Sequence, residues 1–241
     1  MFGLMDYMGQ GGMAEFAVAD PKLLARIPEG LGFVEASSLP RASLTAWQAV
    51  MVKGKGAVGE GKRVLVTGAT GAVGRMGVQM ARDVVGEKGR VVAVGGKGSE
   101  GLTELGADVF VDYREQRNWE DAVRAEGLVD WVFDCVGGET LERCLMLVKD
   151  DGQIVTIGSS PPVWENVKGW EEAKRRRVDG LFFIVAENGE QLVEIGQLAR
   201  TGAIKPSVSL VVDGLSEEGV RDSWTRAEKG GLSGSIVVKI L

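Results

Sequence analysis

From Arg63 to Val185, two kinds of hydrophobic segment alternate along the chain. Short runs rich in β-branched residues predict strands, and between them apolar residues recur at helical spacing. The predicted strands are RVLVTGA, RVVAVGG, DVFVDY, VDWVFDCVG, GQIVTIG and GLFFIV. The predicted helical segments are AVGRMGVQMARDV, SEGLTELG, NWEDAVRAEG and ETLERCLMLV. Because the strand runs are almost continuously apolar, they indicate a parallel sheet with helices on both faces, a doubly wound α/β fold.

The pattern changes after residue 185. GEQLVEIGQLARTG predicts a helix that ends before Gly202, and IKPSVSLVV and SIVVKIL predict strands with the helix SEEGVRDSWTRAEK between them. Near the other end, Ala14, Phe16 and Val18 occupy alternate positions, as in a half-buried strand. These segments do not continue the strand–helix alternation, so we expect them to form a second, smaller module.

Composition excludes several classes of function. The 241 residues carry a net charge of -6, which argues against nucleic-acid or anionic-membrane partners. No apolar stretch is long enough to span a bilayer, and the N-terminus does not resemble a signal peptide. The two cysteines lack C-x-x-C spacing, which suits a reducing compartment, and we expect a cytoplasmic protein.

The absence of histidine from the sequence bears on the chemistry directly. With a histidine count of zero, neither a Ser–His nor a Cys–His nucleophile system can form. A zinc site would need the two cysteines and carboxylates, so no metal site is predicted.

The stretch VLVTGATGAVGRMGVQMAR has the form of a strand, a turn of small residues and a helix that begins near Ala72. A dinucleotide site needs a tight turn, close approach to a pyrophosphate and close packing of helix on strand. Gly71 can allow the approach and Gly74 the packing, while Ala69 replaces the first glycine of G-x-G-x-x-G, with Gly68 before it. The helix N-terminus then offers N–H groups to phosphates. Nucleotide binding is predicted; the alternative is a fold of this type without its ligand.

The end of the second strand indicates which nucleotide. NAD enzymes usually carry an Asp or Glu there, which holds the ribose hydroxyls. Here the strand ends in Gly95, Gly96 and Lys97, and the first acid is Glu100. Lys97 can pair with a 2′-phosphate, so NADPH is favoured over NADH, although Lys97 can equally be an ordinary loop lysine.

Taken together, these motifs resemble the medium-chain dehydrogenase/reductase superfamily, in its zinc-free quinone oxidoreductase and enoyl reductase branch. The segments that carry the resemblance are GGMAEFAVADPKLLARIPEGLGFVEASSLPRASLTAWQAV, GATGAVG, LGADVFVDYRE, VDWVFDCVGGETLERCL and DGQIVTIGS. The resemblance implies a Rossmann dinucleotide-binding domain at 41–186. It also implies a partial GroES-like catalytic module formed by 1–40 and the C-terminal return at 187–241. By this resemblance, most of the first part of the catalytic domain is missing, in a naturally shortened protein or a fragment.

The resemblance further implies a set of cofactor-binding residues. They are Ala69, Gly71, Ala72, Val73, Gly74, Gly96, Lys97, Tyr113, Cys135, Val136, Gly158, Ser159, Phe183 and Val185. In this interpretation Tyr113 lies against the adenosine phosphate, and Thr45 and Ser159 lie beside the nicotinamide. Tyr113 can alternatively be a strand-end aromatic, and Cys135 a small buried hydrophobe. Arg41 departs from the family, whose members usually have an apolar residue there; it can bind an anionic substrate or, as we slightly favour, pair with an acid.

The function implied is NADPH-dependent hydride transfer to an enone, enoyl or quinone substrate, with a proton from solvent, Thr45 or Ser159. The expected substrate is a small apolar carbonyl or polyketide-like compound, and a homodimer through the edge strand Leu181–Val185 is a further expectation. The alternative is a scaffold repurposed as a cofactor-independent cyclase or isomerase, or as a non-catalytic binding protein. In that case Trp164 and Trp170 can supply apolar walls, unless they simply pack on the core.

Overall fold

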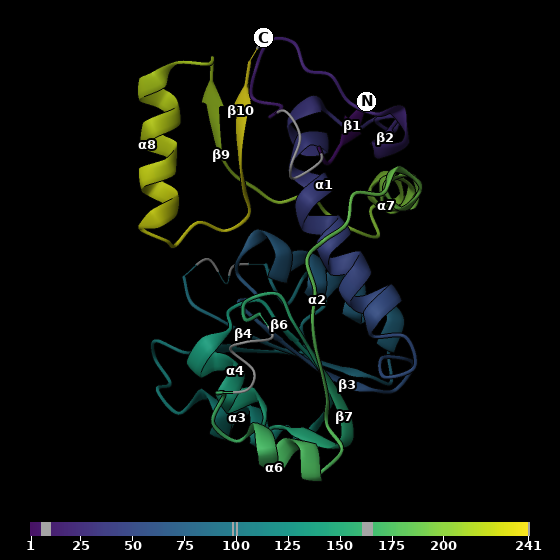
Figure 1. Ribbon diagram of the computed structural model, residues 1–241, viewed down its shortest axis with the longest axis vertical. Coiled ribbons are helices and arrows are strands. Elements are labelled where there is room, and N and C mark those ends of the chain that lie inside the picture. Colours follow the sequence, from purple (N-terminus) through teal and green to yellow (C-terminus); the bar gives the residue numbers. More distant parts are fainter. Residues whose placement is uncertain (6–10, 98, 100, 161–165, 241) are drawn as a thin grey trace.

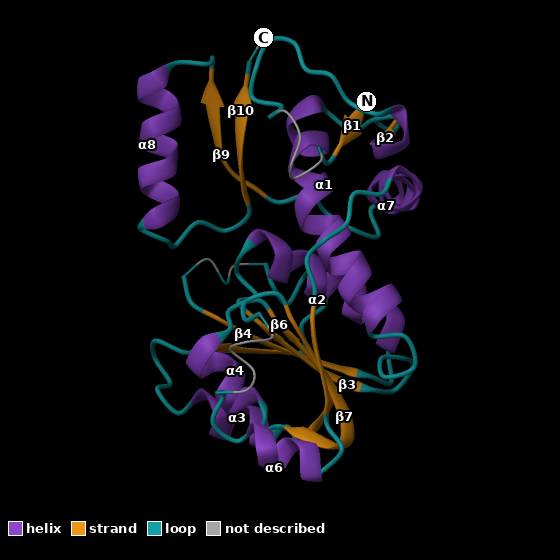
Figure 2. Cartoon of the chain, in the orientation of Figure 1, coloured by secondary structure: helices purple, strands orange, loops and turns teal. Residues whose placement is uncertain are grey.

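The computed structural model describes residues 1–5, 11–97, 99, 101–160 and 166–240, and its centre is a six-stranded parallel sheet (Figures 1 and 2). The strand order is β5-β4-β3-β6-β7-β8. The strands are β3 (Arg63–Thr67), β4 (Arg90–Gly95), β5 (Val109–Asp112), β6 (Val129–Asp134), β7 (Val148–Thr156) and β8 (Asp179–Phe182). The first strand of the series lies in the middle and the order reverses there, so the predicted doubly wound sheet is confirmed.

Helices cover both faces of this sheet (Figure 2). One face carries α1 (Phe33–Trp47) and α2 (Ala72–Val85), and the other carries α3 (Trp119–Ala125), α4 (Gly138–Cys144) and α6 (Trp170–Arg175). Alternate residues of β3 pack into the two hydrophobic cores, one on each face of the sheet. Val64 and Val66 of β3 belong to the α1–α2 side, whereas Leu65 belongs to the other. Both faces are therefore buried, which explains the continuous apolar runs.

A second group of elements lies beyond α1 and α2 (Figure 1). It contains β1 (Phe2–Gly3), antiparallel to β2 (Leu24–Ala25), and β9 (Val208–Asp213), parallel to β10 (Ser235–Lys239), with helices α7 (Gly189–Thr201) and α8 (Glu217–Glu228). Gly202 follows α7 with φ of 78°, a left-handed conformation that ends the helix as the sequence predicts. None of the described helices has the length and apolar character needed to cross a bilayer.

Helix α1 joins this group to the sheet, and it continues as a π-helix from Gln48 to Lys53. The expected domain boundary at residue 40 lies inside α1. The Gln48 amide pairs with the peptide of Ala186: Nε2 donates to the carbonyl oxygen at 2.8 Å, and the Ala186 N–H donates to Oε1 at 3.0 Å. Gln79 of α2 accepts from the N–H of Lys205 at 2.7 Å. These two buried glutamines fix the segments on either side of α7.

Two predicted elements differ from the structure. Residues 14–18 form no strand, and Phe16 is 91% exposed, because no neighbouring strand pairs with this segment. The expected helix SEGLTELG is replaced by turns over 101–106, where Gly101 and Gly106 have φ of 75° and 105°. Positive φ at both ends interrupts a right-handed helix. Glu100 and Trp164 lie outside the described residues.

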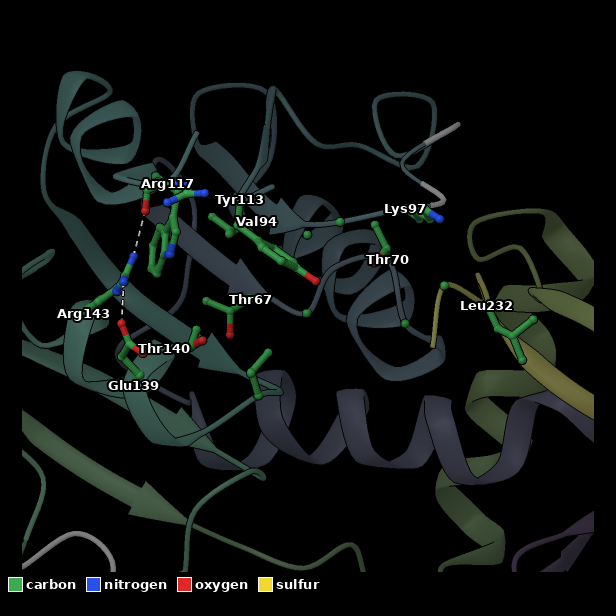
Figure 3. A pocket seen from close by; sticks show the side chains of 17 residues that line it. Thr67, Thr70, Val94, Lys97, Tyr113, Arg117, Glu139, Thr140, Arg143 and Leu232 are labelled. Atoms are coloured by element: carbon green, nitrogen blue, oxygen red, sulfur yellow. Dashed lines mark hydrogen bonds and ion pairs between the residues drawn. The ribbon is translucent and has the colours of Figure 1, made fainter. Parts of the chain in front are cut away.

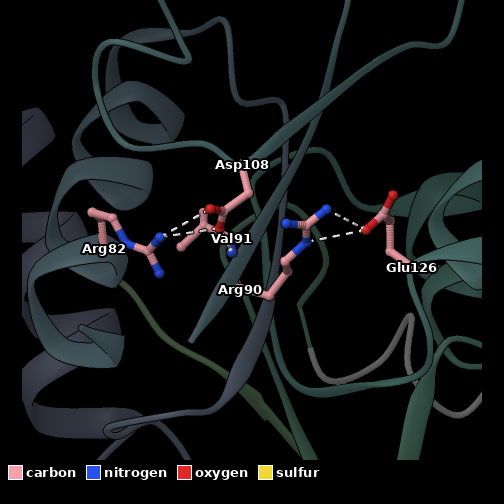
Figure 4. Close-up of polar contacts among 5 residues, drawn as sticks. All are labelled: Arg82, Arg90, Val91, Asp108 and Glu126. Atoms are coloured by element: carbon pink, nitrogen blue, oxygen red, sulfur yellow. Dashed lines mark hydrogen bonds and ion pairs between the residues drawn. The ribbon is translucent and has the colours of Figure 1, made fainter. Parts of the chain in front are cut away.

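Ion pairs fix the amino ends of the strands (Figure 4). Asp108, just before β5, accepts from the N–H of Val91 at 2.7 Å and pairs with Arg82 of α2 at 3.1 Å. Arg90 pairs with Glu126 at 2.6 Å. Ion pairs thus occupy the amino ends of these strands. The loops described below lie at the carboxyl ends.

Packing of α2 on β6 depends on Gly77, and this generates a stability prediction. A Cβ there would lie 2.8 Å from Cδ1 of Phe133, which is fully buried. We expect Gly77→Val to lower the free energy of unfolding by about 2–3 kcal/mol, because the core cannot absorb the added volume. The matched control is Gly59→Val, in open space, which should change it by less than about 0.5 kcal/mol. Urea denaturation measures both, and equal effects would contradict the prediction.

Candidate functional site

The turns after β3, β6 and β7 are tied together by one buried carboxylate, that of Asp134. The hydroxyl of Thr67 donates to Oδ1 and that of Thr156 to Oδ2, each at 2.6 Å. The N–H groups of Val136 and Gly137 donate to the same two oxygens at 3.2 and 2.9 Å. Four donors surround a carboxylate with no exposed surface, so the ends of three neighbouring strands are held in one arrangement.

Glycines let these turns approach one another. Gly68 has φ of 61°, and a Cβ there would lie 3.0 Å from a methyl group of Val136. A Cβ at Gly74 would collide with the carbonyl oxygen of Gly68, which confirms the predicted close packing of α2 on the β3 turn. A Cβ added at Gly71 would lie 3.4 Å from that same oxygen, with no other described atom closer than 4 Å. No side chain caps the N-terminus of α2. The backbone of the turn is therefore accessible to a ligand, as a pyrophosphate-binding loop requires.

A cavity of about 670 Å³ lies on one side of this loop (Figure 3). Its walls come from the loop itself, the end of β4, the turn after β5, the start of α4 and the segment before β10. Of the predicted cofactor residues, it contains Gly71, Gly96, Lys97, Tyr113 and Val136. The Tyr113 ring packs on the backbone at Gly96, where a Cβ would lie 2.9 Å from its hydroxyl oxygen.

Charge in this first cavity is mostly positive. Figure 3 shows Lys97 on one side of it and Arg117 and Arg143 on the other. Arg143 pairs with Glu139, the only carboxylate among the described lining residues. Lys97 and Arg117 form no ion pair within the described part of the chain. The cavity therefore suits a ligand with an anionic group.

A second cavity of about 490 Å³ lies on the other side of the loop. Gly68 and Gly71 line both cavities, so the two meet at the glycine turn. The second is bounded by α1, the start of α2, Cys135, Ile157 and the start of β10. Burial raises the pKa of the Cys135 thiol well above its usual value, and the charge of Asp134 adds to this. The thiol is thus neutral and serves as an apolar wall.

The predicted residues divide between these cavities and the core. Ala72, Val73, Gly74 and Cys135 line the second cavity. Outside both linings are Thr45, Ala69, Gly158, Ser159, Phe183 and Val185.

The two predicted catalytic residues, Thr45 and Ser159, are among the residues outside both cavities. Thr45 is buried inside α1, not at a helix start, and its hydroxyl donates to the carbonyl oxygen of Arg41 at 2.7 Å. Ser159 is also buried, and its Oγ accepts from the N–H of Gly138 at 2.9 Å. Neither side chain faces a described cavity, because each is drawn into a local hydrogen bond.

The other outlying residues have structural positions. The N–H of Ala69 donates to the carbonyl oxygen of Val94 at 3.0 Å, and the side chain is fully buried. Strand β8 ends at Phe182, before the predicted end, and Phe183 and Val185 pack in the core on the α1–α2 side. Gly158 contacts the β6 turn, where a Cβ would collide with the backbone of Val136.

Several residues of the site were absent from the sequence prediction, notably Thr67, Asp134, Thr156, Arg117 and Trp119. Three of them share a signal in the sequence: each is a polar residue at the last position of an apolar strand run. Arg117 and Trp119 follow the turn after β5 and carry no comparable signal.

Sheet order, glycine turn and paired cavities together are those of the Rossmann class of dinucleotide-binding folds. A family model described as zinc-binding dehydrogenase matches residues 105–238. The chain belongs to this family, within the medium-chain dehydrogenase/reductase superfamily, as the sequence resemblance predicts.

Named relatives agree with the family. The chain is 32% identical over 234 residues to 2-methylene-furan-3-one reductase of Solanum lycopersicum, covering 95% of this chain and 52% of that protein. It is 31% identical over 244 residues to the chloroplast envelope quinone oxidoreductase homolog of Arabidopsis thaliana, covering 98% of this chain and 71% of that protein. Among solved structures, the quinone oxidoreductase from Coxiella burnetii superposes with a TM-score of 0.76 at 28% identity, covering 92% of this chain and 66% of that one. The chain thus spans about half the length of the tomato reductase.

The family's description implies zinc, but the described residues do not fit a zinc site. Zinc sites in proteins use Cys, His and carboxylate ligands in clusters of three or four. The sequence has no histidine, and the described residues contain no group of three or more potential ligands. No chemical step is therefore built on zinc.

The carboxylate of Asp134 gives a testable prediction. Each oxygen of Asp134 accepts from one hydroxyl and one backbone N–H. In Asp134→Asn an NH₂ group replaces one of these oxygens, so the backbone N–H that it accepted from loses its acceptor and stays buried and unpaired. We expect a loss of about 2 kcal/mol in the free energy of unfolding. Asp83→Asn, at an exposed position of α2, is the isosteric control. Guanidinium denaturation of the two variants checks this, and an Asp134→Asn chain as stable as the control would contradict the assigned role.

Proposed function

We propose that this protein is an NADPH-dependent reductase of an enone, enoyl or quinone substrate. The observation that carries the proposal is the pair of cavities that meet at the glycine turn. A dinucleotide has two halves joined by a pyrophosphate, and this arrangement offers one cavity to each half with the uncapped α2 terminus between them. The names of the relatives, among them a quinone oxidoreductase homolog and an NADPH-dependent alkenal/one oxidoreductase, support the reaction class.

In this proposal the first cavity holds the adenosine half. Tyr113 covers the backbone at Gly96, and Lys97 lies at the end of β4, where an NAD enzyme usually has a carboxylate. The only acid among the described lining residues, Glu139, is already paired with Arg143. Lys97 is therefore available for a 2′-phosphate, which favours NADPH over NADH.

The second cavity holds the nicotinamide half and the substrate. When bound, the nicotinamide would supply the hydride that adds to the β-carbon of an enone or to a quinone. Val73, Cys135 and Ile157 provide apolar walls that orient the reacting groups. Because the hydroxyls of Thr45 and Ser159 are buried and hydrogen-bonded, we assign delivery of the balancing proton to solvent.

The lining of the two cavities does not support the cyclase or binding-protein alternative. Trp170, which it invoked as a pocket wall, packs against the core on the α3–α4 side and lines neither cavity. Trp164 lies outside the described residues.

We also propose a homodimer through the edge strand. β8 is the last strand of the sheet and, among the described strands, pairs only with β7, which leaves its other edge for a partner. Ile184, just after it, is 70% exposed. Two such edges can pair across a two-fold axis and bury this side chain.

The cofactor assignment is tested by titrating the chain with NADPH and NADH, following nicotinamide fluorescence. We expect NADPH to bind more tightly, and Lys97→Gln to weaken NADPH about five- to tenfold while leaving NADH within about twofold, since one charge-assisted contact is lost. Lys55→Gln, an exposed lysine in a turn outside both cavities, is the matched control. Equal loss of both cofactors in Lys97→Gln would remove Lys97 from the 2′-phosphate site, and absence of binding at millimolar cofactor would overturn the reductase proposal.

The dimer is tested by sedimentation velocity. We expect a dimer for the unmodified chain and a shift toward monomer for Ile184→Lys, because a charge at the paired edge opposes its burial. Val193→Lys, at an exposed position of α7, should leave the distribution unchanged. A monomeric unmodified chain at micromolar concentration would contradict the proposal.

A further inference from the structure

Arg41 lies at the second cavity, and no carboxylate of the described residues pairs with it. It lies in the third turn of α1, is exposed to solvent, and lines the cavity. Ion pairs hold other arginines of the chain, including Arg82 and Arg90, but among the described residues none involves Arg41. The expected pairing of Arg41 with an acid is therefore not found in the described part of the chain, although the sequence has 34 acidic residues against 28 basic ones. Its guanidinium is available to a ligand.

The rest of the second cavity offers no competing charge. Arg41 is the only charged residue among the described residues that line it. Ser37 and Ser38 are close on the same helix, but their hydroxyls donate to the carbonyl oxygens of Val34 and Glu35 at 2.9 and 2.7 Å. The remaining walls are largely apolar, from Ala42, Val73, Cys135, Ile157 and Ile236. The cavity thus combines an apolar interior with one cation.

Two anions could reach this cation: the pyrophosphate of the dinucleotide and an acidic group on the substrate. The pyrophosphate already has the uncapped N–H groups at the start of α2 and the open backbone at Gly71. Arg41 comes from a different helix, α1, which also lines the cavity. The charge of Arg41 is therefore not needed to bind the pyrophosphate and can serve the substrate.

The exposure of the lining residues sets the direction in which a ligand would enter. Arg41 is exposed, whereas Cys135 and Ile157, after β6 and β7, are partly buried and pack against the core. A substrate whose carboxylate lies several bonds from its reducible carbon matches this arrangement.

We propose that Arg41 binds a carboxylate on the substrate, so that the preferred substrate is an anionic enone or enoyl compound with an apolar reactive end. This rests on the proposed reductase function and names its substrate class. The guanidinium forms charge-assisted hydrogen bonds to the carboxylate at the mouth of the cavity, while the conjugated part enters the apolar interior.

The test uses two probes of the same shape, para-carboxybenzylideneacetone and its methyl ester. In the rigid carboxylate probe, the ring separates the charge from the reducible carbon. We expect the unmodified chain to favour the carboxylate in kcat/KM, and Arg41→Gln to lower that value about tenfold, chiefly through KM, with the ester and the NADPH Kd changed less than about twofold. Arg41→Lys should retain part of the preference. Arg26→Gln removes an exposed arginine outside both cavities and is the charge-matched control.

Calorimetric binding of the two probes is measured in parallel, with and without the oxidised cofactor, so that the result does not depend on turnover. If the carboxylate probe binds and Arg41→Gln weakens that binding, the role of Arg41 is supported. If in addition neither probe is reduced, the proposed reductase function fails while the role of Arg41 stands. A chain that binds the carboxylate no more tightly than the ester overturns it. Equal losses for both probes in Arg41→Gln, or a weakened NADPH Kd alone, also overturn it, since Arg41 would then serve the fold or the pyrophosphate.

Discussion

The buried carboxylate of Asp134 is the interaction on which the site depends. Taking a charge out of water is costly unless donors surround it, and here two hydroxyls and two backbone N–H groups do so. Those donors come from the ends of β3, β6 and β7. The carboxylate therefore sets where three turns stand relative to one another, and the glycine loop, the Val136 wall and the Gly158 turn take their positions from it.

The two ends of the parallel sheet are stabilised by different means. At the amino ends, ion pairs such as Arg90 with Glu126 join helices and loops to the strands at a partly exposed surface. At the carboxyl ends, the central carboxylate, that of Asp134, is buried and satisfied by hydroxyls and backbone N–H groups, and the cavities lie beside it. This division keeps the acidic partners Asp108 and Glu126 away from the region where an anionic ligand is proposed to bind, so they do not repel it.

Much of the fold could be predicted from the sequence, because its signals are local. The six strands and helices α2, α7 and α8 follow from hydrophobic period and glycine placement, and the loop from Gly68 to Gly74 follows from its strand–turn–helix context. Prediction failed at Phe16 because alternation alone does not supply a partner strand. It did not indicate that the hydroxyls of Thr45 and Ser159 are buried and hydrogen-bonded, since which hydroxyls face a cavity depends on packing between distant segments. Arg117 and the Asp134 network likewise arise only when three or more loops meet in space.

The walls of both cavities include residues from the very end of the described chain. Gly231 and Leu232 border the first cavity, and Ser235 and Ile236 border the second, where Ser235 donates to the carbonyl oxygen of Ser38. During synthesis, the strands of the central sheet leave the ribosome well before these residues. Domains generally fold as units in the order in which they emerge. The sheet can therefore assemble while the chain is still growing, whereas each cavity gains the wall next to β10 only when that strand docks against α1, so the scaffold of the site precedes the site itself.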